Sequence, residues 1–170
     1  MRVLPTKAPP LGCCQSCFHP RPRPRAGFSG SAILGGVDSR ADLIEAAQAG
    51  LRPHRVGDRL FGDVCAVLLT DAGNRFAGVS IDTGSGTGFC AEHSAIAAMV
   101  TAGEYRIAAI VAVWRDEQGR LYVVPPCGRC REFMRQVDSA NLDAQVLLGG
   151  SRSALLRDLL PEHGWPDPEG

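Results

Sequence analysis

The sequence predicts an α/β domain in which helices cover both faces of a mixed five-stranded sheet, a three-layer α/β/α sandwich. Segments with helical spacing of apolar residues alternate with short apolar runs bounded by turn residues, and that alternation is typical of this class. The chain has 170 residues, of which 45% are hydrophobic. One domain of that size buries a sizeable core without disulfide bonds.

A composition change near residue 38 separates a leader, 1–37, from the domain, 38–170. The leader is rich in proline, arginine and glycine, and it carries five basic residues and no acid. The other 13 basic residues and all 18 acids lie in 38–170, which therefore has a net charge of −5. We expect a disordered leader, and we hypothesise that the native product lacks it, which an intact-mass measurement would test. A domain with that charge is not expected to bind nucleic acid, since phosphate contacts need Lys and Arg.

The first half of the domain predicts a helix, a hairpin and a second helix. Asp38 or Ser39 can cap the first helix, which ends at Gly50. A glycine-rich loop at 84–88 precedes the second helix, which Gly103 closes. The predicted segments are a helix over 38–50, strands over 64–69 and 76–81 joined by a turn at 71–74, and a helix over about 90–102.

The second half predicts three strands and two helices. Turn residues at 116–119 separate two of the strands, and two prolines at 125–126 introduce a helix. Ser151 is expected to cap the final helix, which runs through Leu159. The predicted segments are strands over 107–114, 121–124 and 144–148 and helices over about 128–137 and 151–159.

The cysteines indicate a reducing compartment and a metal site. The chain contains seven cysteines, and no secretory signal precedes them. The longest apolar run, 107–114, is too short to span a bilayer. We therefore expect a cytoplasmic protein without membrane contact, in which clustered cysteines are metal ligands or catalytic groups rather than disulfides. The cluster of Cys13, Cys14, Cys17 and His19 lies in the leader, and we interpret it as incidental, with adventitious zinc binding as the alternative.

Three cysteines at predicted helix starts form the candidate metal site. Cys127 and Cys130 share one helical face, and Cys90 begins the preceding helix. Free N–H groups and the dipole at such helix ends favour thiolate over thiol. Three thiolates leave the fourth tetrahedral position of a zinc ion open, which is the arrangement of a catalytic zinc. Glu92, two residues after Cys90, could then move protons between a zinc-activated water and a substrate.

The motifs Cys90-Ala91-Glu92 and Pro126-Cys127-Gly128-Arg129-Cys130 resemble the zinc-dependent cytidine deaminase family. Its small cytidine and blasticidin S deaminase branches are the most similar, over about residues 64–161. The resemblance implies the cytidine deaminase fold, a Zn²⁺ cofactor and a homotetramer that shares active sites across interfaces. It also implies release of ammonia from a cytosine ring, with Glu92 as the proton carrier and the Ala91 backbone N–H facing the ring O2.

The sequence departs from the family at two places. Cytidine deaminases carry an Asn-x-Glu pair that binds the ribose, and the matching residues here are Ser80 and Asp82. Many relatives have arginine directly after the catalytic glutamate, where this chain has His93. Arg129 lies between the paired cysteines, as in blasticidin S deaminase. Arg129, and His93 as a second donor, could withdraw charge from the zinc-bound sulfurs.

Three alternatives to a cytidine deaminase stay open. A deaminase of a cytosine nucleoside antibiotic such as blasticidin S fits Arg129 and the altered pair Ser80 and Asp82. A non-catalytic zinc module would leave Glu92 without a role. An enzyme that edits polynucleotides is supported only by the arginine-rich leader, and the charge of the domain opposes it.

Overall fold

The computed structural model describes residues 39–164. The predicted leader, its cysteine cluster and the last six residues lie outside the described residues. None of the helices within 39–164 combines the length and the apolar character needed to cross a bilayer.

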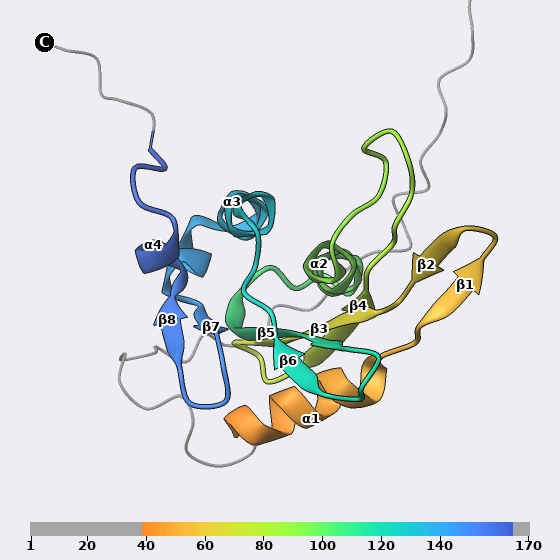
Figure 1. The fold of residues 1–170 in the computed structure, drawn as a ribbon. Coiled ribbons are helices and arrows are strands. Elements are labelled where there is room, and N and C mark those ends of the chain that lie inside the picture. Colours follow the sequence, from red (N-terminus) through yellow and green to blue (C-terminus); the bar gives the residue numbers. More distant parts are fainter. Residues whose placement is uncertain (1–38, 165–170) are drawn as a thin grey trace, which may run out of the picture.

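The core of the fold is a mixed, six-stranded sheet (Figure 1). Its strand order is β4-β3-β5-β7-β8, with β6 also paired to β5. Strands β5 and β7 are parallel, and the other pairs in this sheet are antiparallel. The strands are β3 (Val64–Thr70), β4 (Arg75–Val79), β5 (Ile107–Arg115), β6 (Leu121–Val123), β7 (Gln145–Leu147) and β8 (Ser153–Leu155).

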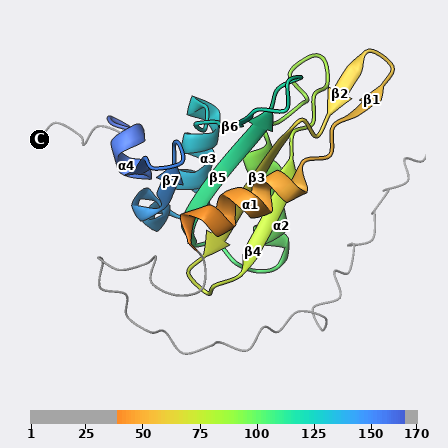
Figure 2. The same ribbon diagram turned by 60° about the horizontal axis from the view of Figure 1, so that its bottom comes forward.

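Both faces of β3 and β5 are covered, which explains why these strands read as continuous apolar runs. On β3, Ala66 and Leu68 face one cluster of buried residues, and Val67 and Leu69 face the other. The first cluster includes residues of α2 (Ala91–Thr101) and α3 (Gly128–Val137), and the second includes residues of α1 (Arg40–Gly50). Figures 1 and 2 show α1 on one side of the sheet and α2 and α3 on the other.

Helix boundaries follow local capping chemistry. Ser39 and Asp42 form a capping box at the start of α1, in which Ser39 is the N-cap. Asp38, the other predicted cap, lies outside the described residues. Helix α3 leads into a short 3-10 helix, η1 (Ser139–Asp143). There the buried side chain of Asn141 accepts from the Ile107 N–H at 2.8 Å and donates to the carbonyls of Met134 and Tyr105. These bonds tie the end of α3 to the start of β5.

Two parts of the sequence prediction differ from the structure. The prediction of a helix over 151–159 is wrong in its first half. Residues 153–155 form strand β8, and only α4 (Leu156–Leu159) is helical. Strand β8 pairs with β7, which makes the sheet six-stranded rather than five-stranded. A hairpin of β1 (His54–Val56) and β2 (Arg59–Phe61) was also missed. Most residues of this hairpin are exposed, so it lacks the alternation of buried residues that reveals a strand.

Candidate active site

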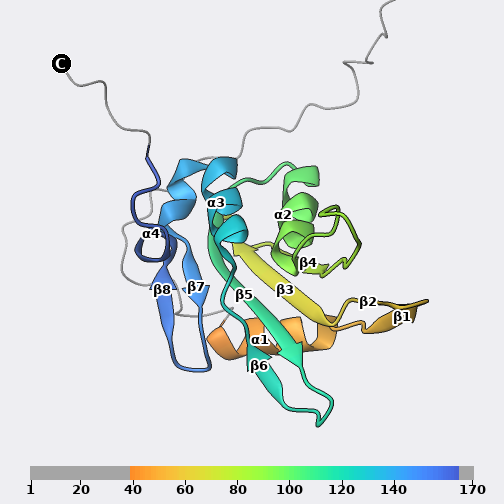
Figure 3. The same ribbon diagram turned by 45° about the horizontal axis from the view of Figure 1, so that its top comes forward.

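The N-termini of α2 and α3 meet on one face of the sheet (Figure 3). Cys90 is the N-cap residue of α2, and Cys127 is the N-cap residue of α3. Neither side chain caps its own helix, so both thiols remain available for other partners. Cys130 lies one turn into α3, where it is fully buried.

The three sulfurs form a compact group whose spacing fits zinc. The Sγ atoms of Cys90 and Cys127 are 3.8 Å apart, and those of Cys127 and Cys130 are 3.4 Å apart. Two sulfurs that bind one zinc ion at 2.3 Å and a tetrahedral angle lie about 3.8 Å apart. The predicted convergence of these cysteines from two helix starts is therefore present in the structure.

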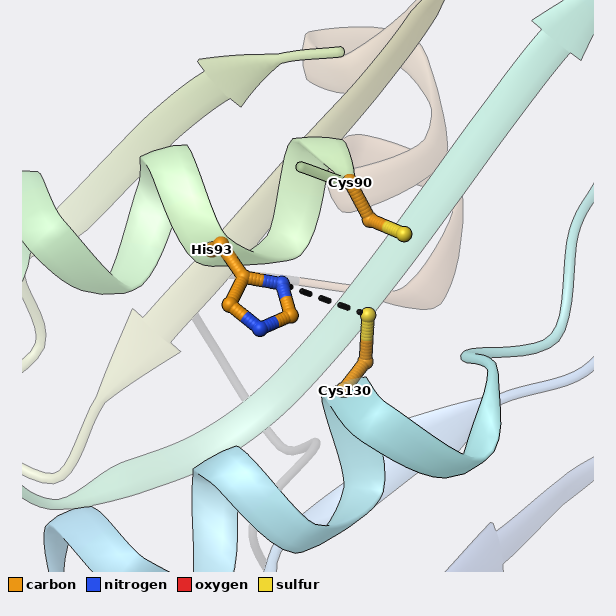
Figure 4. Close-up of side chains that lie close together, drawn as sticks. All are labelled: Cys90, His93 and Cys130. Carbon is orange, nitrogen blue, oxygen red and sulfur yellow. Dashed lines mark hydrogen bonds between the residues drawn. The ribbon is translucent and has the colours of Figure 1, made fainter. Parts of the chain in front are cut away.

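His93 lies against the same group (Figure 4). Its Nδ1 is 3.5 Å from the Cys130 Sγ, and the ligand atoms of Cys90, His93 and Cys130 all lie within 4.8 Å of one another. The imidazole ring stacks on Phe133, with centroids 4.6 Å apart and an interplanar angle of 14°. Burial, and then the charge of Arg129, lower the pKa of His93, which favours the neutral ring. A neutral imidazole can bind a metal ion through Nδ1 or donate an N–H to a thiolate from the same atom.

Glu92 is buried in the first turn of α2, with 5% of its surface exposed. Burial raises the pKa of its carboxyl, while its own backbone N–H and the Cys130 thiol, which both donate to it, act in the opposite direction. The Glu92 carboxyl and the Cys130 thiol are therefore neighbours, since each affects the pKa of the other. A buried carboxyl with a raised pKa, close to candidate metal ligands, is suited to carry protons.

The thiols differ in how easily they ionise. Burial raises the pKa of Cys130, and the neighbouring Glu92 carboxylate raises it further. Burial also raises the pKa of Cys90. At Cys127 burial acts in the same direction, but hydrogen bonds from the N–H groups of Cys130 and Arg129 and from both other thiols outweigh it, and the pKa is lowered. A divalent cation among these groups would offset the burial and the Glu92 charge that raise the pKa of Cys130, so the donor set fits zinc.

The structure brings the predicted substrate-binding residues to the same end of α2. Ser80 follows β4, and its hydroxyl donates to the Asp63 carboxylate at 2.8 Å. Asp82 is exposed at the start of the glycine-rich loop, and Ala91 is fully buried in the first turn of α2. Their contacts with a substrate remain predictions. No sequence pattern singled out Asp63, which lies in the short connection between β2 and β3.

Arg129 lies at the edge of the site with its side chain exposed. Its guanidinium donates to the Gly88 carbonyl at 3.5 Å, so a side-chain bond from Arg129 to a sulfur remains a prediction. The backbone N–H of the same residue does contact Cys127. Phe133, which supports His93, was not singled out from the sequence, where it reads as an ordinary apolar position in α3.

Comparison with known proteins agrees with this geometry. Residues 43–143, more than half of the chain, match the family described as the cytidine and deoxycytidylate deaminase zinc-binding region. A solved cytidine deaminase from Burkholderia pseudomallei is 30% identical, with a TM-score of 0.60 over 74% of this chain and 98% of that one. A variant of the Mycobacterium tuberculosis cytidine deaminase is 27% identical, with a TM-score of 0.62 over 76% of this chain and 100% of that one. The chain therefore belongs to the cytidine and deoxycytidylate deaminase family of zinc-dependent hydrolases.

Proposed function

We propose that this protein converts a cytosine nucleoside, cytidine or deoxycytidine, to the uracil form and releases ammonia. The observation that carries the proposal is the burial of Glu92 in the first turn of α2, the helix whose N-cap residue, Cys90, belongs to a cluster of sulfurs spaced for one zinc ion. Similarity to proteins described as cytidine deaminases, at 27% and 30% identity, supports the choice of substrate.

Glu92 has the central role in the proposed reaction. Zinc, when bound, supplies a water molecule with a lowered pKa at the open position of its coordination shell. The Glu92 carboxylate accepts a proton from that water and delivers protons to N3 of the ring and to the departing amino group. One water is consumed, and the exocyclic C4–N bond is replaced by a C4–O bond as ammonia leaves. The backbone N–H of Ala91, at the free N-terminal end of α2, is proposed to bind the ring O2.

We assign Cys90, Cys127 and Cys130 as the zinc ligands and His93 as a donor to Cys130. The spacing of 3.4 to 3.8 Å between neighbouring sulfurs supports this set. The stacking of His93 on Phe133 supports a fixed ring that neutralises part of the thiolate charge. In the competing arrangement Cys90, His93 and Cys130 bind the ion and the exposed Cys127 does not.

A second candidate is deamination of a cytosine nucleoside antibiotic. It is favoured by Arg129 between the paired cysteines and by the change of the sugar-binding pair to Ser80 and Asp82. Comparing ammonia release from cytidine, deoxycytidine, cytosine and blasticidin S separates the two candidates. For either substrate we also propose a cytoplasmic homo-oligomer.

The substitution Glu92→Gln tests the proposal. The neutral amide has nearly the same shape but cannot carry protons, so we expect zinc content to be unchanged and kcat to fall at least 100-fold. Glu117→Gln changes an exposed turn residue in the same way and is the matched control. Full activity of the Glu92→Gln enzyme would contradict the assigned role. Absence of ammonia release by the unmodified protein from every cytosine compound would favour a non-catalytic zinc module.

A further inference from the structure

Asp63, which was not assigned to the site from the sequence, is hydrogen-bonded to Ser80, one of the expected substrate-binding residues. The Ser80 Oγ donates to the Asp63 Oδ1 at 2.8 Å and accepts from the Val64 N–H at 3.2 Å. Asp63 is half-buried, and within residues 39–164 the bond to Ser80 is the side-chain contact that its carboxylate makes. The second carboxylate oxygen therefore remains available to another donor.

Two contacts show that Ser80 lies beside the first turn of α2. At the residue before Ser80, the Val79 carbonyl accepts a hydrogen bond from the Ser94 hydroxyl at 2.7 Å. At the residue after Ser80, Ile81 forms an antiparallel bridge with Phe89. Strand and helix run in opposite directions here, so Ser80 is adjacent to 90–93, the turn that carries the metal-binding and catalytic groups. Because Asp63 is hydrogen-bonded to Ser80, it also lies near this turn of α2.

The local backbone is built to hold Asp63 in this position. Gly62 has a φ of +69°, a left-handed conformation that glycine adopts without strain. Its carbonyl accepts from the Arg52 N–H at 2.9 Å, and its N–H donates to the Ser80 carbonyl at 3.0 Å. A Cβ atom on Gly62 would be 2.4 Å from the Arg52 carbonyl oxygen, so only glycine fits. The turn thus fixes both ends of the contact between Asp63 and Ser80.

The hydrogen-bonding capacity of this pair selects what it can bind. A serine hydroxyl has one donor and two acceptor positions. In Ser80 the donor position and one acceptor position are occupied. What remains is one acceptor position on Ser80 and the free oxygen of Asp63, so the pair can accept but not donate. A sugar hydroxyl satisfies such a pair, whereas an ionised phosphate, which only accepts, does not.

We propose that Asp63 is a specificity-determining residue of the deamination site, where with Ser80 it accepts a hydrogen bond from a sugar hydroxyl of the substrate. This inference rests on the proposed function. Binding through a carboxylate is worth roughly 10- to 100-fold in affinity. That contribution belongs only to substrates that carry the hydroxyl in question.

The test measures KM and kcat of the zinc-loaded Asp63→Asn enzyme on cytidine, 2′-deoxycytidine, 3′-deoxycytidine and cytosine. We expect KM to rise roughly 10- to 100-fold for cytidine. For cytosine, and for the deoxynucleoside that lacks the recognised hydroxyl, KM should change less than twofold. Zinc content and Tm should stay unchanged. Asp58→Asn, an equivalent change in the exposed turn of the β1–β2 hairpin, is the matched control and should alter no substrate.

Ser80→Ala provides a second variant in case Asp63→Asn weakens folding, and we expect the same dependence on the sugar hydroxyl. An equal loss on all four compounds, or no change on any, overturns the role of Asp63 and leaves the proposed deaminase function in place. Failure of the unmodified enzyme to release ammonia from any of the four overturns the proposed function itself.

Discussion

Replacing Gly78 with alanine tests whether close packing between β4 and α2 positions the active site. Gly78 lies in β4, directly against the middle of α2. A Cβ atom there would be 2.2 Å from the Ala95 backbone nitrogen and 2.4 Å from the Ser94 Cβ. The contacting nitrogen belongs to the helix backbone, so a change of rotamer cannot relieve the overlap.

The size of the effect follows from these distances. Restoring an ordinary van der Waals separation of about 3.4 Å moves α2 away from β4 by about 1.2 Å. Zinc sites tolerate deviations of only about 0.2 Å in ligand distances. Since Cys90 begins α2 while Cys127 begins α3, such a shift opens the sulfur cluster. We expect a zinc affinity at least tenfold lower and a loss of about 2–3 kcal/mol in the free energy of unfolding.

Zinc affinity is measured by competition with a chromophoric chelator, and stability by thermal unfolding of the metal-free protein. The expected stability loss corresponds to a decrease in Tm of roughly 8–12 °C. Gly150→Ala is the matched control, because its added Cβ meets nothing within 4 Å. If Gly78→Ala binds zinc as tightly as Gly150→Ala and melts at the same temperature, then this contact does not position the site.

Two further predictions concern the buried amide and the ligand set. Asn141→Ala leaves the buried Ile107 N–H and two carbonyls without their partner, so urea unfolding should show a loss of about 3 kcal/mol in the free energy of unfolding. The exposed Asn74→Ala is the control. An equal effect of both changes would refute the stabilising role of Asn141. With three cysteine ligands, Cys127→Ser should weaken zinc binding at least 100-fold, whereas His93→Gln should weaken it less than tenfold. Absorption bands of the Co²⁺-substituted protein report the number of bound sulfurs. If His93→Gln weakened zinc binding more than Cys127→Ser, the ligands would instead be Cys90, His93 and Cys130.

Elements with strong periodicity or capping signals could be predicted from sequence. Helix α3 and strands β3 and β5 lie within one or two residues of the predicted bounds. Strand β8 could not be predicted, because its three partly buried residues carry no pattern of their own and follow Ser151, which was expected from the sequence to cap a helix. They become a strand only because β7 offers an unpaired edge.

The motif cysteines and Glu92 could be singled out from sequence as candidate site residues, because the chemistry of zinc restricts which residue types work at those spacings. The pair of Asp63 and Ser80 could not, since it joins residues 17 positions apart across a glycine turn. The position of His93 relative to Cys130 likewise depends on how α2 and α3 pack.

The sequence by itself determined the fold class, the helix starts that carry the cysteines, and the acid beside them. These features follow from local spacing, capping and residue chemistry. Only the tertiary structure decided which sulfurs lie close enough to bind one ion, that His93 joins them, and that Asp63 holds Ser80. Such contacts depend on how distant segments pack, and packing distances are fixed by the whole core rather than by any one stretch of chain.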